Sequence, residues 1–86
     1  MRVEHLSSPD CPNAAASRAL LTECLEALGL TASVVERVGA FPSPSVLVDG
    51  ADVMSPDQPP TGECCRLDVP TRGAILAALQ RAADRR

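Results

Sequence analysis

The sequence predicts an α/β sandwich in which two helices cover a mixed sheet, in the order β–α–β–β–(β)–α. With 86 residues the chain has room for one domain, residues 1–86. Two segments repeat their apolar residues at helical spacing, and short β-branched segments separate them. The first two strands flank a helix long enough for a right-handed crossover, so we expect them to be parallel.

The first half of the chain is predicted to be β–α–β. Residues 2–6 read as a strand that ends in the polar and proline-containing segment 7–10. Residues 14–28 contain no Gly or Pro, and Gly29 is a typical helix-ending residue. The apolar stripe of this helix consists of Leu21, Cys24, Leu25 and Leu28. The β-branched segment 32–38 is the second expected strand.

The second half is predicted to close the sheet and add a helix. We expect a turn over residues 39–44 and a strand over 45–48, closed by the Asp49-Gly50 dipeptide. An edge strand comes from 51–54 or from 65–69, and three prolines make 51–62 irregular. Thr71 is positioned to cap the last helix. The expected apolar stripe of that helix consists of Ile75, Leu76, Leu79 and Ala83.

Composition excludes several classes of function. Phe41 is the only aromatic residue, which argues against single-stranded nucleic-acid binding by base stacking. A net charge of −3 leaves no basic surface for nucleic acid or anionic lipid. No segment approaches the ~20 apolar residues of a membrane span, and the N-terminus lacks the apolar core of a signal peptide. We therefore expect a cytoplasmic protein with neither nucleic acid nor membrane as partner.

The four cysteines are the main candidates for chemistry. In the cytoplasm they are expected to be thiols, metal ligands or redox groups. Cys11 lies at the predicted start of the first helix, where the helix dipole favours a thiolate, so we expect it to have the lowest thiol pKa of the four. Cys24 lies on an apolar stripe and is expected in the core. Cys64 and Cys65 are adjacent, so in extended backbone they point to opposite faces.

Four short motifs resemble small actinobacterial thioredoxin-like proteins that are often labelled alkylmercury lyase-like. They are an Asp-Cys-Pro-Asn turn at residues 10–13, a Ser-Pro-Ser strand start at 43–45, a Val-Asp-Gly turn at 48–50 and a Cys-Arg-Leu segment at 65–67. The resemblance covers nearly the whole chain. It implies a minimal thioredoxin-like sandwich in which Cys11 is the reactive residue and Pro44 is a cis-proline facing it.

The sequence departs from the thioredoxin pattern at one position that matters. Ala14 stands where a dithiol oxidoreductase has its second cysteine, so Cys11 has no local thiol to resolve a mixed disulfide. Cys11 then works as a monothiol with a low-molecular-weight thiol or a protein disulfide, or its partner is Cys64 or Cys65. The turn before the last helix lies beside the active site in related folds, and Cys65 is our first choice. A disulfide requires the two Cα atoms to lie within about 7 Å.

Two other functions remain open. Cys11, Cys64 and Cys65 together could hold a soft ion such as Hg(II) or Cu(I), with organomercurial cleavage assisted by Asp10 or Asp68 as the acid. Zinc is disfavoured, since a closed zinc site takes four ligands and His5 is expected to be a packed polar residue of the first strand. The last possibility is a thioredoxin-like module without catalytic activity.

Overall fold

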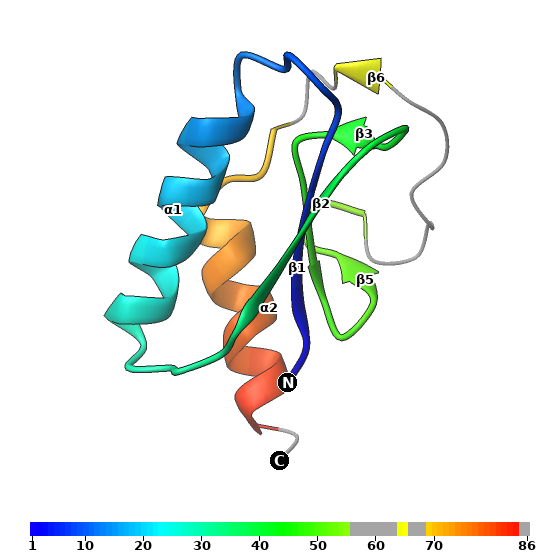
Figure 1. The fold of residues 1–86 in the computed structure, drawn as a ribbon. Coiled ribbons are helices and arrows are strands. Elements are labelled where there is room, and N and C mark those ends of the chain that lie inside the picture. Colours follow the sequence, from blue (N-terminus) through cyan, green and yellow to red (C-terminus); the bar gives the residue numbers. More distant parts are fainter. Residues whose placement is uncertain (56–63, 66–68, 85–86) are drawn as a thin grey trace.

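The computed structural model describes residues 1–55, 64–65 and 69–84, with Cys64 and Cys65 described by their backbone. It confirms the α/β class. A four-stranded mixed sheet has the order β2-β1-β4-β5, and both helices cover one of its faces (Figure 1). The strands of this sheet are β1 (Val3–Ser7), β2 (Val34–Val38), β4 (Ser45–Val48) and β5 (Ala51–Asp52), and the helices are α1 (Ala14–Ala27) and α2 (Arg72–Asp84).

Strand β1 lies at the centre of the sheet. It pairs in parallel with β2, so that His5 lies opposite Glu36, which confirms the expected crossover through α1. On its other side it pairs antiparallel with β4, and β4 pairs antiparallel with β5 after the Asp49-Gly50 turn. The edge strand of the sheet therefore comes from the first of the two segments we considered.

The segment around Cys65 pairs elsewhere. Two short strands, β3 (Pro42–Ser43) and β6 (Cys64–Cys65), form a separate parallel ladder. This corrects the expectation of a turn throughout 39–44. Two residues of extended backbone have no periodicity of their own, and only their pairing with a segment about twenty residues later makes them a strand.

The core lies between the sheet and the helices. Val3 of β1 and Val46 and Val48 of β4 share the face of the sheet that the helices cover. Buried residues of the two helices complete this cluster: Leu21, Cys24, Leu25, Ile75, Ala78, Leu79 and Ala82. The α2 stripe thus includes Ala78 and Ala82 where the sequence suggested Leu76 and Ala83. Alanine at these positions allows α1 and α2, which are in contact, to approach closely.

Both predicted helix ends are confirmed. The Thr71 hydroxyl accepts a hydrogen bond from the Ala74 N–H at 3.2 Å, which caps α2. At the end of α1, Gly29 has φ +67° and its N–H donates to the Glu26 carbonyl. The Leu30 N–H donates to the Leu25 carbonyl at 2.9 Å, which completes a Schellman motif.

Alanine substitutions at two glycines should change stability in opposite directions. A Cβ at Gly29 or Gly73 would meet no atom within 4 Å, so steric contact does not distinguish them. Gly29→Ala forces a left-handed conformation and is expected to lower the free energy of unfolding by about 1 kcal/mol. Gly73→Ala, in the first turn of α2, is expected to raise it by about 0.5 kcal/mol. Urea unfolding of the two variants measures both changes, and shifts of equal sign would contradict this explanation.

Candidate functional site

Cys11 lies in the turn that joins β1 to α1. Its N–H donates to the Ser8 carbonyl, and its own carbonyl accepts from the Ala14 N–H, both at 3.3 Å. Asp10, immediately before it, has φ +63°, a conformation that a short polar side chain tolerates. The residue is half-buried. The backbone of the turn is therefore held at both sides of Cys11.

The helix begins later than the sequence suggested. The first residue of α1 is Ala14 and its N-cap is Asn13, so Pro12 and Cys11 precede the helix. Cys11 lies two residues before the N-cap, and the influence of a helix dipole decreases beyond the first turn. The expected acidity of Cys11 stays a prediction.

The segment that carries Cys64 and Cys65 lies at the same end of the sheet as the Cys11 turn. Ser45, the first residue of β4, pairs with Leu6 near the end of β1, so the preceding β3 lies where the Cys11 turn leaves the sheet. In the β3–β6 ladder Cys65 is paired with Ser43. β3 and β6 lie at the same end of the molecule as the β1–α1 turn (Figure 1). The side chains of Cys64 and Cys65 are outside the described residues, so which of them faces Cys11 stays a prediction.

Pro44 lies between β3 and β4 and is fully buried. The Ser43–Pro44 peptide bond is cis, as the resemblance implied. The Ser45 hydroxyl donates to the Pro42 carbonyl at 2.6 Å. The Ser43 hydroxyl is buried and has no hydrogen-bond partner within the part of the chain that the structure describes. The predicted packing of Pro44 against the Cys11 sulfur stays a prediction.

Cys24 belongs to the core, as expected. It is 0% exposed, and its sulfur lies 4.0 Å from the Arg72 carbonyl oxygen. Burial raises the pKa of the Cys24 thiol, with the Arg72 charge acting in the opposite direction and the Glu23 charge reinforcing the increase. Cys24 is therefore a packed thiol rather than a nucleophile.

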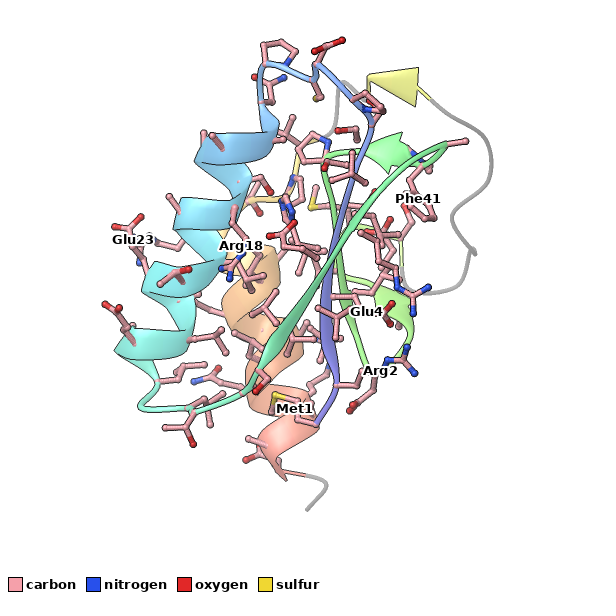
Figure 2. All side chains as sticks on the ribbon, viewed as in Figure 1. Met1, Arg2, Glu4, Arg18, Glu23 and Phe41 are labelled. Carbon is pink, nitrogen blue, oxygen red and sulfur yellow. The ribbon has the colours of Figure 1, made fainter. Side chains whose placement is uncertain are left out.

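His5 is buried, and it contacts a partly exposed pair of charged side chains that the sequence did not reveal. Its Nδ1 lies 3.0 Å from the Glu36 Oε2, and the Arg18 Nε lies 2.5 Å from the Glu36 Oε1. Figure 2 shows Arg18 extending from α1 toward the sheet. The His5 Nε2 is buried without a partner among the described residues. These contacts link β1, β2 and α1, which agrees with the expectation of a packed polar residue.

A second charged cluster lies on the opposite face of the sheet. The Glu4 carboxylate is buried between two guanidinium groups, with the Arg2 Nε at 3.2 Å and the Arg37 Nε at 3.3 Å. Figure 2 shows Arg2 and Glu4 together on the side away from the helices. Each pair joins a buried carboxylate to an exposed cation, and the Glu4–Arg37 pair links the central strand β1 to the neighbouring strand β2.

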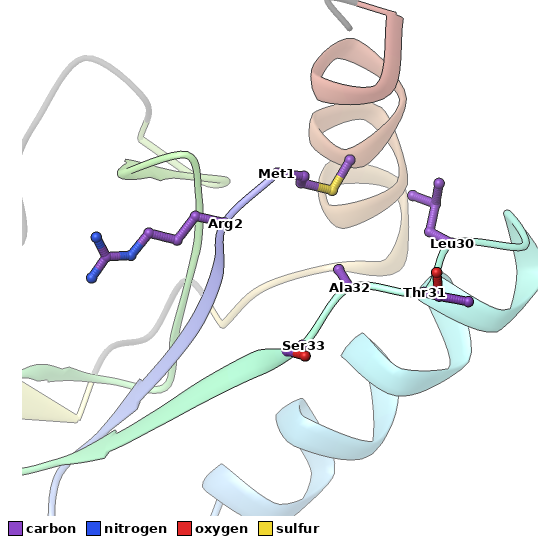
Figure 3. Close-up of a pocket in the computed structure, with 6 residues that line it drawn as sticks. All are labelled: Met1, Arg2, Leu30, Thr31, Ala32 and Ser33. Atoms are coloured by element: carbon purple, nitrogen blue, oxygen red, sulfur yellow. The ribbon is translucent and has the colours of Figure 1, made fainter.

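A pocket of about 390 Å³ opens at the other end of the sheet from Cys11. It is lined by Met1, Arg2, Leu30, Thr31, Ala32 and Ser33. The Arg2 side chain extends away from the remaining lining residues (Figure 3), and it is the side chain that pairs with Glu4. The guanidinium group of Arg2 is therefore directed away from the pocket.

No family model, curated protein or solved structure matches this chain. Within the described residues, no group of three or more His, Cys, Asp or Glu side chains could hold a metal ion. The proposed ligand set of Cys11, Cys64 and Cys65 lies partly outside that search, as does Asp68, so it stays a prediction. In the same part of the chain, neither helix has the length and apolarity to cross a membrane.

Proposed function

We propose that the chain is a thioredoxin-like thiol–disulfide redox protein in which Cys11 is the nucleophile and Cys65 the resolving thiol. The observation that supports this function is the β3–β6 ladder. It brings the backbone of Cys65 to the end of the sheet where the Cys11 turn emerges. Ala14 stands where a dithiol oxidoreductase has its second cysteine. The long-range pairing of Ser43 with Cys65 supplies a candidate for that second thiol.

The reaction has two exchange steps. The Cys11 thiolate attacks one sulfur of a substrate disulfide, forming a mixed disulfide and releasing the other substrate sulfur as a thiolate. The Cys65 thiolate then attacks the Cys11 sulfur, which releases the second substrate thiolate and leaves a Cys11–Cys65 disulfide. Two electrons have passed to the substrate. A low-molecular-weight thiol, itself oxidised to its disulfide, returns the protein to the dithiol form.

The register of β6 favours a single resolving residue. Cys64 is paired with Pro42, and Cys65 with Ser43. Because neighbouring side chains of a strand point to opposite faces, we expect only one of Cys64 and Cys65 to be directed at Cys11. Cys65 is proposed because its partner Ser43 immediately precedes the buried Pro44.

Mapping the disulfide formed on oxidation tests this function. Diamide, which takes two electrons from a pair of thiols, is expected to produce a Cys11–Cys65 bridge in the reduced protein. The bridge should persist in Cys64→Ser and be lost in Cys65→Ser, a control matched in chemistry and position. Peptide mass spectrometry of non-reduced digests identifies the bridge. A Cys11–Cys64 bridge, or any bridge through Cys24, would contradict the assignment.

Two other experimental outcomes would indicate a function in which Cys65 does not resolve a mixed disulfide. If Cys11 forms only mixed disulfides with added thiols, the protein acts as a monothiol and Cys65 has no part in it. If the reduced protein retains one Hg(II) or Cu(I) per chain, loses it in both Cys11→Ser and Cys65→Ser, and reduces no disulfide, the thiols serve a soft metal instead.

A further inference from the structure

A small pocket lies between the start of α1 and the segment that leads into α2. Its volume is about 170 Å³, and it is lined by Asn13, Ala16, Ser17, Leu20, Val69 and Pro70. Figure 1 shows the segment before α2 passing alongside the first turns of α1. The two elements come from opposite ends of the chain, so only the folded protein forms this pocket.

The pocket is adjacent to the Cys11 turn. Asn13, in its wall, is two residues from Cys11, and the Ala14 N–H to Cys11 carbonyl hydrogen bond closes the turn between them. In such a turn the Cα atoms of the first and fourth residues lie within about 7 Å. A group attached to a sulfur that is bonded to Cys11 can therefore reach the pocket opening.

The chemistry of the wall is mainly apolar. Leu20 and Val69 contribute hydrocarbon surface, and Val69 is 38% exposed although it is a large apolar residue. Among the described residues of the wall none carries a charged side chain. Ser17 is only 6% exposed, and its hydroxyl has no hydrogen-bond partner within the described residues. The Ser17 hydroxyl oxygen is itself buried, so the described wall offers a ligand mainly hydrocarbon surface.

We propose that this pocket is a substrate subsite for an apolar group about the size of benzene, attached close to the substrate sulfur. The proposal rests on the reactivity proposed for Cys11 and names the substrate class for it. An apolar cavity of about 150 Å³ is sufficient for benzene, so the volume fits. Charged groups are disfavoured, since the described part of the wall offers no opposite charge to compensate for their loss of solvent.

The first test measures binding without using Cys11 chemistry. Benzyl alcohol, titrated into the ¹⁵N-labelled protein, is expected to cause saturable amide shifts confined to residues 13–20 and 69–71. Ala16→Leu, which fills the pocket, should abolish them, whereas Ala15→Leu, a neighbouring exposed position outside the wall, should preserve them. Shifts elsewhere, or shifts that Ala16→Leu leaves intact, would overturn the proposal.

The second test compares two reagents that each transfer an alkylthio group to the sulfur of Cys11. Benzyl and methyl methanethiosulfonate each form a disulfide with the attacking thiolate and release methanesulfinate. Relative to N-acetylcysteine, Cys11 is expected to prefer the benzyl reagent about tenfold, equivalent to about 1.4 kcal/mol. Ala16→Leu should remove the preference and Ala15→Leu should retain it. Fast reaction with both reagents and no preference overturns the subsite alone. Failure of Cys11 to react with either overturns the proposed function, and the benzyl alcohol titration still decides the subsite.

A third comparison identifies the source of the apolar group. Mixed disulfides of 2-thiopyridine with Gly-Phe-Cys-Gly and Gly-Ser-Cys-Gly present the group as a peptide side chain. Preference for the Phe peptide as well as for the benzyl reagent indicates a peptide or protein disulfide. Preference for the benzyl reagent alone indicates a small-molecule disulfide, and preference for neither contradicts the subsite.

Discussion

Iodoacetamide is expected to modify Cys11 roughly 100-fold faster than Cys24 in the folded protein at neutral pH. Cys11 is half-buried in a turn, whereas Cys24 is 0% exposed in the core. Burial also raises the pKa of the Cys24 thiol above its usual 9.0, which lowers its thiolate fraction at every pH below that value. Mass spectrometry of quenched digests measures both rates in one sample.

The pH dependence of stability follows from the same shift. The unfolded Cys24 thiol ionises near 9.0 and the folded one at higher pH. The contribution of this shift to the free energy of unfolding is therefore fully present below pH 9, and it is lost as pH rises through the folded pKa.

The control for the iodoacetamide experiment is the protein unfolded in urea. There Cys11 and Cys24 should react at similar rates, because only their intrinsic reactivity remains. Modification of Cys24 as fast as Cys11 in the native protein would contradict the burial of α1.

Leu79→Ala is expected to lower the free energy of unfolding by about 3 kcal/mol. Leu79 is fully buried in α2 and belongs to the cluster that joins both helices to the sheet. Removing its terminal carbons loses their transfer free energy and leaves a cavity that the surrounding side chains fill only in part. In a chain of 86 residues this is a large fraction of the total stability. Equilibrium unfolding in urea measures the change.

Leu76→Ala is the matched control for this prediction. Leu76 lies three residues earlier in the same helix and is only partly buried against the core. The same deletion there should cost about 1 kcal/mol, because less hydrocarbon leaves the core and water reaches the space that remains. Equal losses at the two positions would show that the orientation of α2 differs from the one described.

Local chemistry predicted the main elements of the fold. The strand over Ser45–Val48 has the bounds that the sequence suggested, and both helices begin or end at residues whose side-chain and backbone preferences mark helix termini. Thr71 caps α2, and Gly29 adopts a positive φ. These features depend on neighbours within one or two turns of the chain, so the sequence alone contains the information.

The candidate site was only partly predictable. Cys11 could be singled out because of its position after a strand and before a helix, although the helix begins later than expected. Ser17 was missed. It lies four residues before Leu21 on the predicted stripe, so extending the stripe by one turn would have placed it in the interior. That Ser17 lines a pocket depends on Val69 and Pro70, more than fifty residues away.

What the sequence by itself determined is where most helices and strands lie and which cysteine precedes the first helix. What only the tertiary structure decided is the partner of each segment. His5 lies opposite Glu36 because of the register between β1 and β2. Ser43 pairs with Cys65 in a ladder of only two residues per strand. Such pairings are selected by the whole set of long-range contacts, because a short strand gains too little from any local interaction to fix its own partner.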